Sequence, residues 1–137
     1  MTRSEARIEA FKLVFQITAH KDSYPDVVVL FEDENSQLKK SDKKQYNYIV
    51  NTANGVFDNM QEIDECICRN LNKEWNLERL SKVTLAILRL AVYEIKYLED
   101  IPDNVSVNEA IEIAKVYDID DAPSFVNGVL SGVIKEK

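Results

Sequence analysis

Hydrophobic residues recur at three- and four-residue steps along most of the chain, which is the spacing of one face of an α-helix. Residues 42–71 carry the longest such pattern and predict the longest helix, with a seam able to pack against two neighbours. Residues 82–99 are apolar almost all round, which is typical of the buried central helix of a bundle. The pattern therefore predicts an all-α protein. The long seam consists of Tyr46, Ile49, Val50, Ala53, Val56, Phe57, Met60, Ile63, Ile67 and Leu71.

Polar residues mark where several of these helices begin. Thr2 followed by Glu5 is a capping box, in which each side chain accepts a hydrogen bond from the other residue's backbone N–H. It predicts a first helix that extends to about His20. Ser106 followed by Glu109 has the same spacing, so we expect another helix to start directly after this serine.

Prolines divide the rest of the chain. Pro25 suits the first turn of a short helix through residues 27–34, and Pro123 suits the first turn of the last helix. Residues 35–41 are expected to form a loop. With a helical stretch at residues 77–80, the chain has seven helices. Three glycines and three prolines are too few turn residues for a sandwich or barrel.

Two glycines interrupt predicted helices, where glycine costs roughly 1 kcal/mol relative to alanine. Gly55 is expected to mark a bend or a close helix crossing. Gly128 is expected to allow close approach by another helix or by a ligand.

Length and hydropathy place the protein in a broad class. The 137 residues are enough to bury one core without disulfides, so residues 1–137 are expected to form a single domain. No apolar run reaches the roughly 18 residues of a membrane span, and the N-terminus carries no signal-peptide pattern. We therefore expect a cytoplasmic protein without a membrane partner.

Residue types that support catalysis or metal binding are sparse. Cys66 and Cys68 point about 200° apart around a helix and have no histidine cluster nearby, so neither a disulfide nor a zinc site is expected. His20 is the only histidine and reads as a surface or C-cap residue. Asp120 and Asp121 suit a helix N-terminus better than acid–base chemistry. No phosphate loop or nucleophile turn is present, so the sequence indicates a binding protein with no cofactor and no metal.

The charge distribution limits where an anionic ligand would bind. The net charge of −7 argues against indiscriminate nucleic-acid binding. Residues 1–44 hold eight basic and eight acidic side chains, so the whole net negative charge lies in residues 45–137. Arg3 and Arg7 share one face of the first helix and are the strongest candidates for phosphate contact.

Several separated blocks resemble the NusB family of bacterial transcription antitermination factors. The C-terminal part of the resemblance lies in VNEAIEIAK, which begins at Val107, and in SFVNGVL, which begins at Ser124. Further blocks lie at residues 77–80 and 85–94, and at Ala6–Arg7 with the helix ending Phe15–Gln16. The blocks occur in the family order, and together they cover nearly the whole chain.

The resemblance implies a fold and a function. The seven helices would form two small bundles, the first three helices in one and the remainder in the other. The protein would bind the boxA element of an RNA leader together with NusE, a small-subunit ribosomal protein. With RNA polymerase and other Nus factors, this complex would suppress premature termination, notably in ribosomal RNA transcription.

The resemblance also assigns residues to two surfaces. Arg3 and Arg7 would hold boxA phosphates, and Phe125 would stack on an unpaired base, with Asp121 and Ser124 at the same helix start. Read without the family, Phe125 is a core residue and the two arginines are plain surface residues.

Phe15 and Glu78 would face NusE; without the family they read as a core residue and a solvated residue. Two alternatives stay open: an accessory module for an RNA methyltransferase on a separate chain, and a protein-interaction module with little RNA binding of its own. Formation of a homodimer also stays open.

Overall fold

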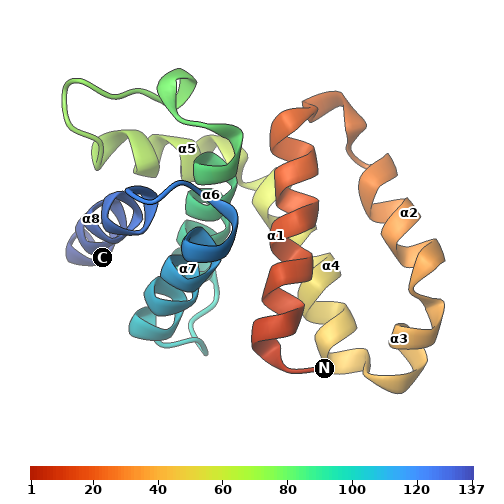
Figure 1. Cartoon of the computed structure of the whole chain (residues 1–137). Coiled ribbons are helices and arrows are strands. Elements are labelled where there is room, and N and C mark those ends of the chain that lie inside the picture. The colour runs from red at the N-terminus through yellow and green to blue at the C-terminus, as the bar shows by residue number, and fades with distance from the viewer.

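The computed structural model describes residues 1–137 and contains eight α-helices, two short 3₁₀ helices and no strand (Figure 1). The α-helices are α1 (Arg3–Ala19), α2 (Asp26–Glu34), α3 (Ser36–Ser41), α4 (Lys43–Asp58), α5 (Met60–Arg69), α6 (Lys82–Tyr97), α7 (Asp103–Tyr117) and α8 (Ala122–Lys135). The 3₁₀ helices are η1 (Lys21–Ser23) and η2 (Leu77–Arg79). None of the helices combines the length and apolar character that a bilayer crossing requires.

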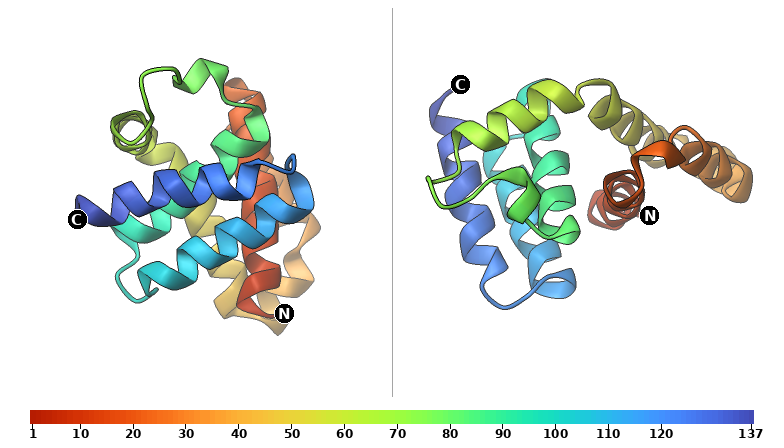
Figure 2. Two further views of the ribbon diagram at one scale, coloured as in Figure 1. Left: turned by 60° about the vertical axis from the view of Figure 1, so that its left-hand side comes forward. Right: turned by 90° about the horizontal axis from the view of Figure 1, so that it is seen from above.

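The helices form two groups that meet along α1 and α6. Helices α1–α4 lie on one side and α5–α8 on the other, as the views in Figures 1 and 2 agree. Helix α1 packs against both α4 and α6, so it belongs to the contact between the groups. Helix α6 also packs against α5, α7 and α8, and it is buried on all sides. One cluster of 37 buried hydrophobic residues runs through both groups.

The predicted start of the first helix is confirmed. The Thr2 hydroxyl accepts from the backbone N–H of Glu5, and the Glu5 carboxylate accepts from the backbone N–H of Thr2. These bonds satisfy two of the N–H groups that have no partner within the helix. Ser81 caps α6 in a similar way, and Pro123 lies in the first turn of α8 as expected.

The predicted long helix over residues 42–71 is wrong, because the chain breaks at Asn59 into α4 and α5. The side-chain amide of Asn59 donates a hydrogen bond of 2.8 Å to the backbone carbonyl of Gly55, near the end of α4. Helix α5 then joins the second group, so α1 is the longest helix. The predicted loop at residues 35–41 is also wrong, since it contains α3. These two changes add two helices to the predicted seven, and the predicted helical stretch at residues 77–80 is the 3₁₀ helix η2, which leaves eight α-helices.

The predicted capping box at Ser106 is wrong as well. Helix α7 begins at Asp103 after Pro102, so Ser106 lies inside the helix. The Ser106 hydroxyl donates instead to Glu94 on α6 at 2.8 Å. The spacing matches a cap, but the side chain takes a tertiary partner.

Gly55 and Gly128 differ in the space around them. A Cβ added at Gly55 would lie 2.3 Å from the Tyr93 hydroxyl, so this glycine marks a close crossing of α4 and α6 as expected. A Cβ added at Gly128 meets nothing within 4 Å. The expected close approach at Gly128 is therefore absent.

Candidate nucleic-acid and partner interface

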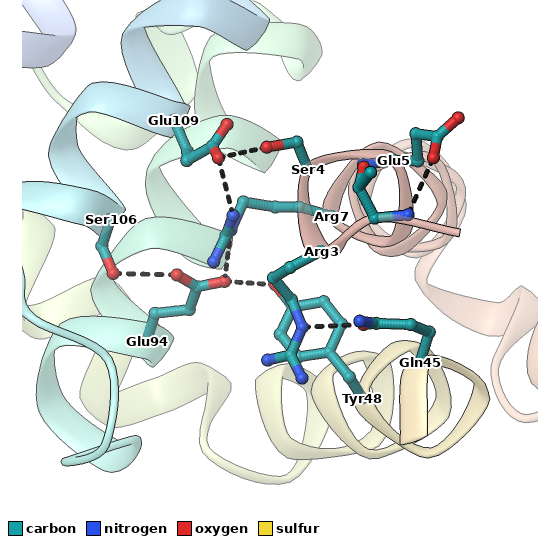
Figure 3. A network of polar contacts seen from close by, with 10 residues as sticks. Arg3, Ser4, Glu5, Arg7, Gln45, Tyr48, Glu94, Ser106 and Glu109 are labelled. Atoms are coloured by element: carbon teal, nitrogen blue, oxygen red, sulfur yellow. Dashed lines mark hydrogen bonds and ion pairs between the residues drawn. The ribbon is translucent and has the colours of Figure 1, made fainter. Parts of the chain in front are cut away.

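Arg7 lies in a buried network where α1 meets α6 and α7 (Figure 3). Its Nε donates to Glu94 at 2.8 Å, and its Nη1 lies 3.2 Å from the Glu109 carboxylate. The side chain is 3% exposed, and that of Glu94 is 1% exposed. Burial alone lowers the pKa of Arg7, but the hydrogen bond and charge of Glu94 outweigh it and raise the pKa. Arg7 is thus a permanent buried cation with two carboxylate partners.

Glu94 is the centre of this network, which we call the junction network and define as Arg7, Tyr48, Glu94, Ser106 and Glu109. Besides Arg7, the Glu94 carboxylate accepts from the hydroxyls of Tyr48 and Ser106. Burial and the charge of Glu94 raise the pKa of Tyr48, which keeps the phenol protonated as a donor. No buried polar side-chain atom in the structure lacks a hydrogen-bond partner. The network therefore satisfies the polar groups that it buries.

The burial of Arg7 contradicts its expected role as a phosphate contact. Its guanidinium is enclosed between α1, α6 and α7, and its donors already face carboxylates. A phosphate would have to compete with two negative charges, those of the buried Glu94 and the partly exposed Glu109. Arg7 instead holds α1 against the second group of helices.

Arg3 is placed differently, although it lies only one helical turn before Arg7. Its guanidinium carbon lies 4.2 Å from the centre of the Tyr48 ring, and its Nε donates to Gln45 at 2.8 Å. It has no ion pair with a carboxylate, so its terminal nitrogens are available. Arg3 lines a groove of about 190 Å³ together with Lys44 of α4. Asp100 also lines this groove, so its two cationic side chains outnumber one carboxylate and leave a net positive charge that suits a phosphate.

Phe125 lines a second hollow at the start of α8. This hollow, which we call the α8 hollow, has a volume of about 350 Å³. The Phe125 ring lies 5.5 Å from the Trp75 ring at an interplanar angle of 57°. Phe125 is half-buried, so it contributes to the core while one part of the ring stays open. The walls are Trp75, Arg79, Leu80, Ser81, Thr84, Ile119, Asp121, Ala122 and Phe125.

Asp121 lines the α8 hollow, and Ser124 lies three residues further along the chain. Both are exposed, and Asp121 stands at the N-cap of α8 without a side-chain capping bond. Its carboxylate therefore adds negative charge at the rim of the hollow. Ser124 offers a hydroxyl on the first turn of the same helix.

The structure does not bring Arg3 and Phe125 into one patch. The Arg3 groove includes Leu98 and Ile101, beyond the end of α6, whereas the α8 hollow includes Ser81, at its start. Helix α6 has 16 residues and is roughly 24 Å long, so the two positions lie near opposite ends of this helix. A ligand that reaches both must be extended.

Phe15 lies on a third hollow, between α1 and the ends of α6 and α7. This hollow also has a volume of about 350 Å³ and is lined by Phe11, Lys12, Phe15, Gln16, Val83 and Tyr117. Phe15 is half-buried, with its ring 6.4 Å from that of Phe11. Val116 on α7 and Ile119 in the segment that follows this helix are each 73% exposed. Apolar surface of this kind suits a protein partner.

Glu78 is exposed on η2, in the segment that also carries Trp75 and Arg79. It forms no ion pair within the chain. Its carboxylate faces solvent, which leaves it available to a basic partner.

The sequence reasoning missed Trp75, Arg79 and Tyr48. Tyr48 lies outside the apolar seam predicted for this helix, and only the fold shows that Arg3 lies over its ring. Trp75 and Arg79 lie in a stretch without helical periodicity, so no local pattern in the sequence predicts that they line a hollow. The one available signal is composition, because Trp75 is the only tryptophan of the chain.

No group of three or more histidine, cysteine, aspartate or glutamate side chains is placed to hold a metal ion. Cys66 is buried and Cys68 is exposed, and both are free thiols.

Comparison with known proteins gives one consistent result. The model of the NusB family matches residues 4–135. The chain is 43% identical to the "Transcription antitermination protein NusB" of Clostridium novyi over 98% of this chain and 99% of that protein. It is also 43% identical to the protein of the same name from Listeria monocytogenes serotype 4a, over 99% of this chain and 98% of that protein.

Solved structures agree with this result. The NusB of T. maritima superposes with a TM-score of 0.87 at 38% identity, covering 99% of this chain and 92% of that one. A second similar chain comes from a crystal structure of the antitermination factors NusB and NusE in complex with double-stranded RNA. It has a TM-score of 0.82 and 26% identity, and each chain is covered fully.

Proposed function

Because the chain belongs to the NusB family, we propose that it is a transcription antitermination factor that binds boxA RNA jointly with NusE. The observation that carries this proposal is the match over nearly the full length to proteins that bear that name. The complex would act with RNA polymerase and other Nus factors, notably on ribosomal RNA operons. We assign the protein no catalytic activity and place it in the cytoplasm.

The RNA surface that we propose has two contact points. Arg3 binds a phosphate from its position on Tyr48, and Phe125 stacks on a base at the α8 hollow, with Ser124 beside it. Because the two contact points lie near opposite ends of α6, which is roughly 24 Å long, the ligand would be an extended single strand of several nucleotides. Arg7 supports the surface indirectly, because the junction network holds the helix that carries Arg3.

The partner surface that we propose is the hollow at Phe15, with the exposed apolar end of α7 beside it. Glu78 adds negative charge near this surface. A net charge of −7 favours association with a basic ribosomal protein, since complementary charge raises the association rate. When both proteins contact one RNA, each raises the apparent affinity of the other.

Measurement of RNA binding with and without NusE tests the proposal. We expect boxA RNA to bind more tightly than a scrambled RNA, and NusE to increase the affinity. Arg3→Gln should weaken binding, while Lys21→Gln, which removes an exposed lysine on η1, should leave it nearly unchanged. Equal affinity for both RNAs in the presence of NusE would contradict the proposal.

One observation favours a second candidate, a protein-interaction module with little RNA binding of its own. Of the two N-terminal arginines, only Arg3 is free to contact RNA. Tight binding of NusE without any gain in RNA affinity would support this candidate.

A further inference from the structure

We propose that Gln45 and Tyr48 of α4 are positioning residues for RNA binding, because together they hold the Arg3 guanidinium in place and leave its two terminal nitrogens for a phosphate. The inference rests on the proposed function, since it assumes that Arg3 contacts RNA. It adds two residues that act through Arg3 and need not touch the RNA themselves.

Gln45 fixes one edge of the guanidinium. A guanidinium carries five N–H donors, one on Nε and four on the two terminal nitrogens. The side-chain oxygen of Gln45 accepts from Nε of Arg3 at 2.8 Å. The terminal nitrogens make no ion pair within the chain, so they keep the paired donors that phosphate oxygens accept.

Tyr48 fixes one face of the same group. The guanidinium carbon of Arg3 lies 4.2 Å from the centre of the Tyr48 ring, which is close enough for a cation–π contact (Figure 3). The ring itself is 7% exposed, and Arg3 lies over it, so Tyr48 is not available to stack on a base. Its effect on RNA must therefore pass through Arg3.

The position of the Tyr48 ring is set by the junction network. Its hydroxyl donates to the buried carboxylate of Glu94, and the guanidinium carbon of Arg7 lies 5.7 Å from the centre of the same ring. Arg3 is half-buried and is not itself a member of the network, yet it lies on a ring that the network holds. The contact between the two groups of helices thus determines where the phosphate donor of α1 stands.

This arrangement lowers the cost of binding. A free arginine side chain loses considerable rotamer freedom when a ligand orders it. An arginine that is already held by a hydrogen bond on one edge and a ring on one face has lost most of that freedom before RNA arrives. Gln45 and Tyr48 should therefore raise RNA affinity without making a contact to RNA.

The side chain of Arg3 can be observed directly in the free protein. In a ¹⁵N-correlated NMR spectrum, its Nε–H signal is assigned as the one that Arg3→Lys removes. We expect this proton to exchange slowly with water, and the δ protons of Arg3 to be shifted upfield by the Tyr48 ring. Gln45→Ala should speed the exchange, whereas Tyr48→Leu should abolish the upfield shift and Tyr48→Phe should keep it.

RNA affinity measures the consequence. Labelled boxA RNA is titrated with each variant in the presence of NusE, and binding is followed by anisotropy. Tyr48→Leu should weaken binding about 2- to 30-fold, and Tyr48→Phe should restore most of this loss because it keeps the ring. Gln45→Ala should weaken binding about 2- to 10-fold. Gln37→Ala, which removes an exposed glutamine from α3, should leave the affinity unchanged, and circular dichroism verifies that each variant is folded.

The Arg3→Gln background distinguishes positioning from a general structural role. Residues that act through Arg3 have nothing left to position once its guanidinium is gone. Tyr48→Leu and Gln45→Ala should therefore cause no further loss of RNA affinity in this background. A residue that only stabilises the fold would weaken binding equally in both backgrounds.

The outcomes separate this inference from the proposed function. Equal losses for Tyr48→Leu with and without Arg3 would overturn the positioning role alone, and so would an Arg3 signal that exchanges fast and shows no upfield shift in the unaltered protein. RNA binding that Arg3→Gln leaves unchanged would overturn the inference together with the phosphate contact at Arg3. Failure of any RNA to bind, with or without NusE, would overturn both the inference and the proposed function.

Discussion

The junction network and the α8 hollow both combine arginine with aromatic side chains, but they differ in what remains unpaired. In the junction network, Arg7 faces two carboxylates and is 3% exposed. In the α8 hollow, Arg79 makes no ion pair, although Asp121 lines the same hollow, and Trp75 is 38% exposed. Donors that are already satisfied hold the helices together, whereas unsatisfied donors beside open rings are available to a ligand. Whether an arginine already has carboxylate partners therefore distinguishes a structural arginine from one that is available to a ligand. Its position along the helix is a poorer guide.

The largest effect should follow from a break in the junction network. Glu94→Gln leaves Arg7 as a buried cation with one weaker partner, so we expect a loss of about 3–5 kcal/mol in the free energy of unfolding. Urea unfolding followed by circular dichroism measures it. The matched double variant Arg7→Met with Glu94→Leu removes both charges and should lose less. A loss below about 1 kcal/mol for Glu94→Gln would show that the pair is not structural.

Substitutions at Gly55 and Gly128 test the difference in packing between the buried helix crossing and the open surface of α8. Gly55→Ala places a methyl group against the buried Tyr93 ring and should destabilise the protein by about 1–3 kcal/mol. Gly128→Ala adds a methyl group in open space on α8 and should stabilise it by about 0.5–1 kcal/mol. Thermal unfolding of both variants measures these changes. Equal effects of the same sign would contradict the difference in packing.

A smaller effect is expected at the rim of the α8 hollow. Asp121→Asn removes a negative charge near the proposed RNA path and should tighten RNA binding about two- to fivefold, in line with a single exposed charge. A titration at fixed salt measures the affinity, and Asp120→Asn provides the control at the neighbouring exposed position. Unchanged affinity for Asp121→Asn would place the RNA elsewhere.

The smallest effect concerns the C-terminal end of α8, where Glu136 lies 2.8 Å from Arg69. Hydrogen bonds from Arg69, and from Cys66 next, hold the pKa of Glu136 at about 2, below its ordinary value of 4.5. Because the folded pKa is lowered, the contribution of Glu136 to stability is complete above about pH 4.5 and is lost as the pH falls toward 2.

The pair is partly solvated, so this contribution is about 0.5 kcal/mol. The stability difference between wild type and Glu136→Gln should therefore be present at pH 7 and vanish by about pH 2, as urea unfolding at each pH would measure. A difference that stays constant over this range would exclude a role for the charge of Glu136.

Local sequence signals were sufficient wherever the interactions are local. The capping box at Thr2 and Glu5 connects residues three apart, and the structure confirms it. The spacing at Ser106 is the same, yet its hydroxyl binds Glu94, twelve residues earlier and on another helix. The break at Asn59 was missed for a similar reason, because the apolar seam continues across it while the two halves pack in different groups.

The sequence by itself determined the all-α class, the positions of most helices and membership of the NusB family, because helical periodicity and family motifs are read along the chain. Only the tertiary structure decided that Arg7 is buried and Arg3 is open, since the partner of Arg7 lies 87 residues away. It also decided that Trp75 and Phe125 share one hollow. Contacts between distant segments depend on how the helices pack, and no local pattern encodes which side chain will find a partner.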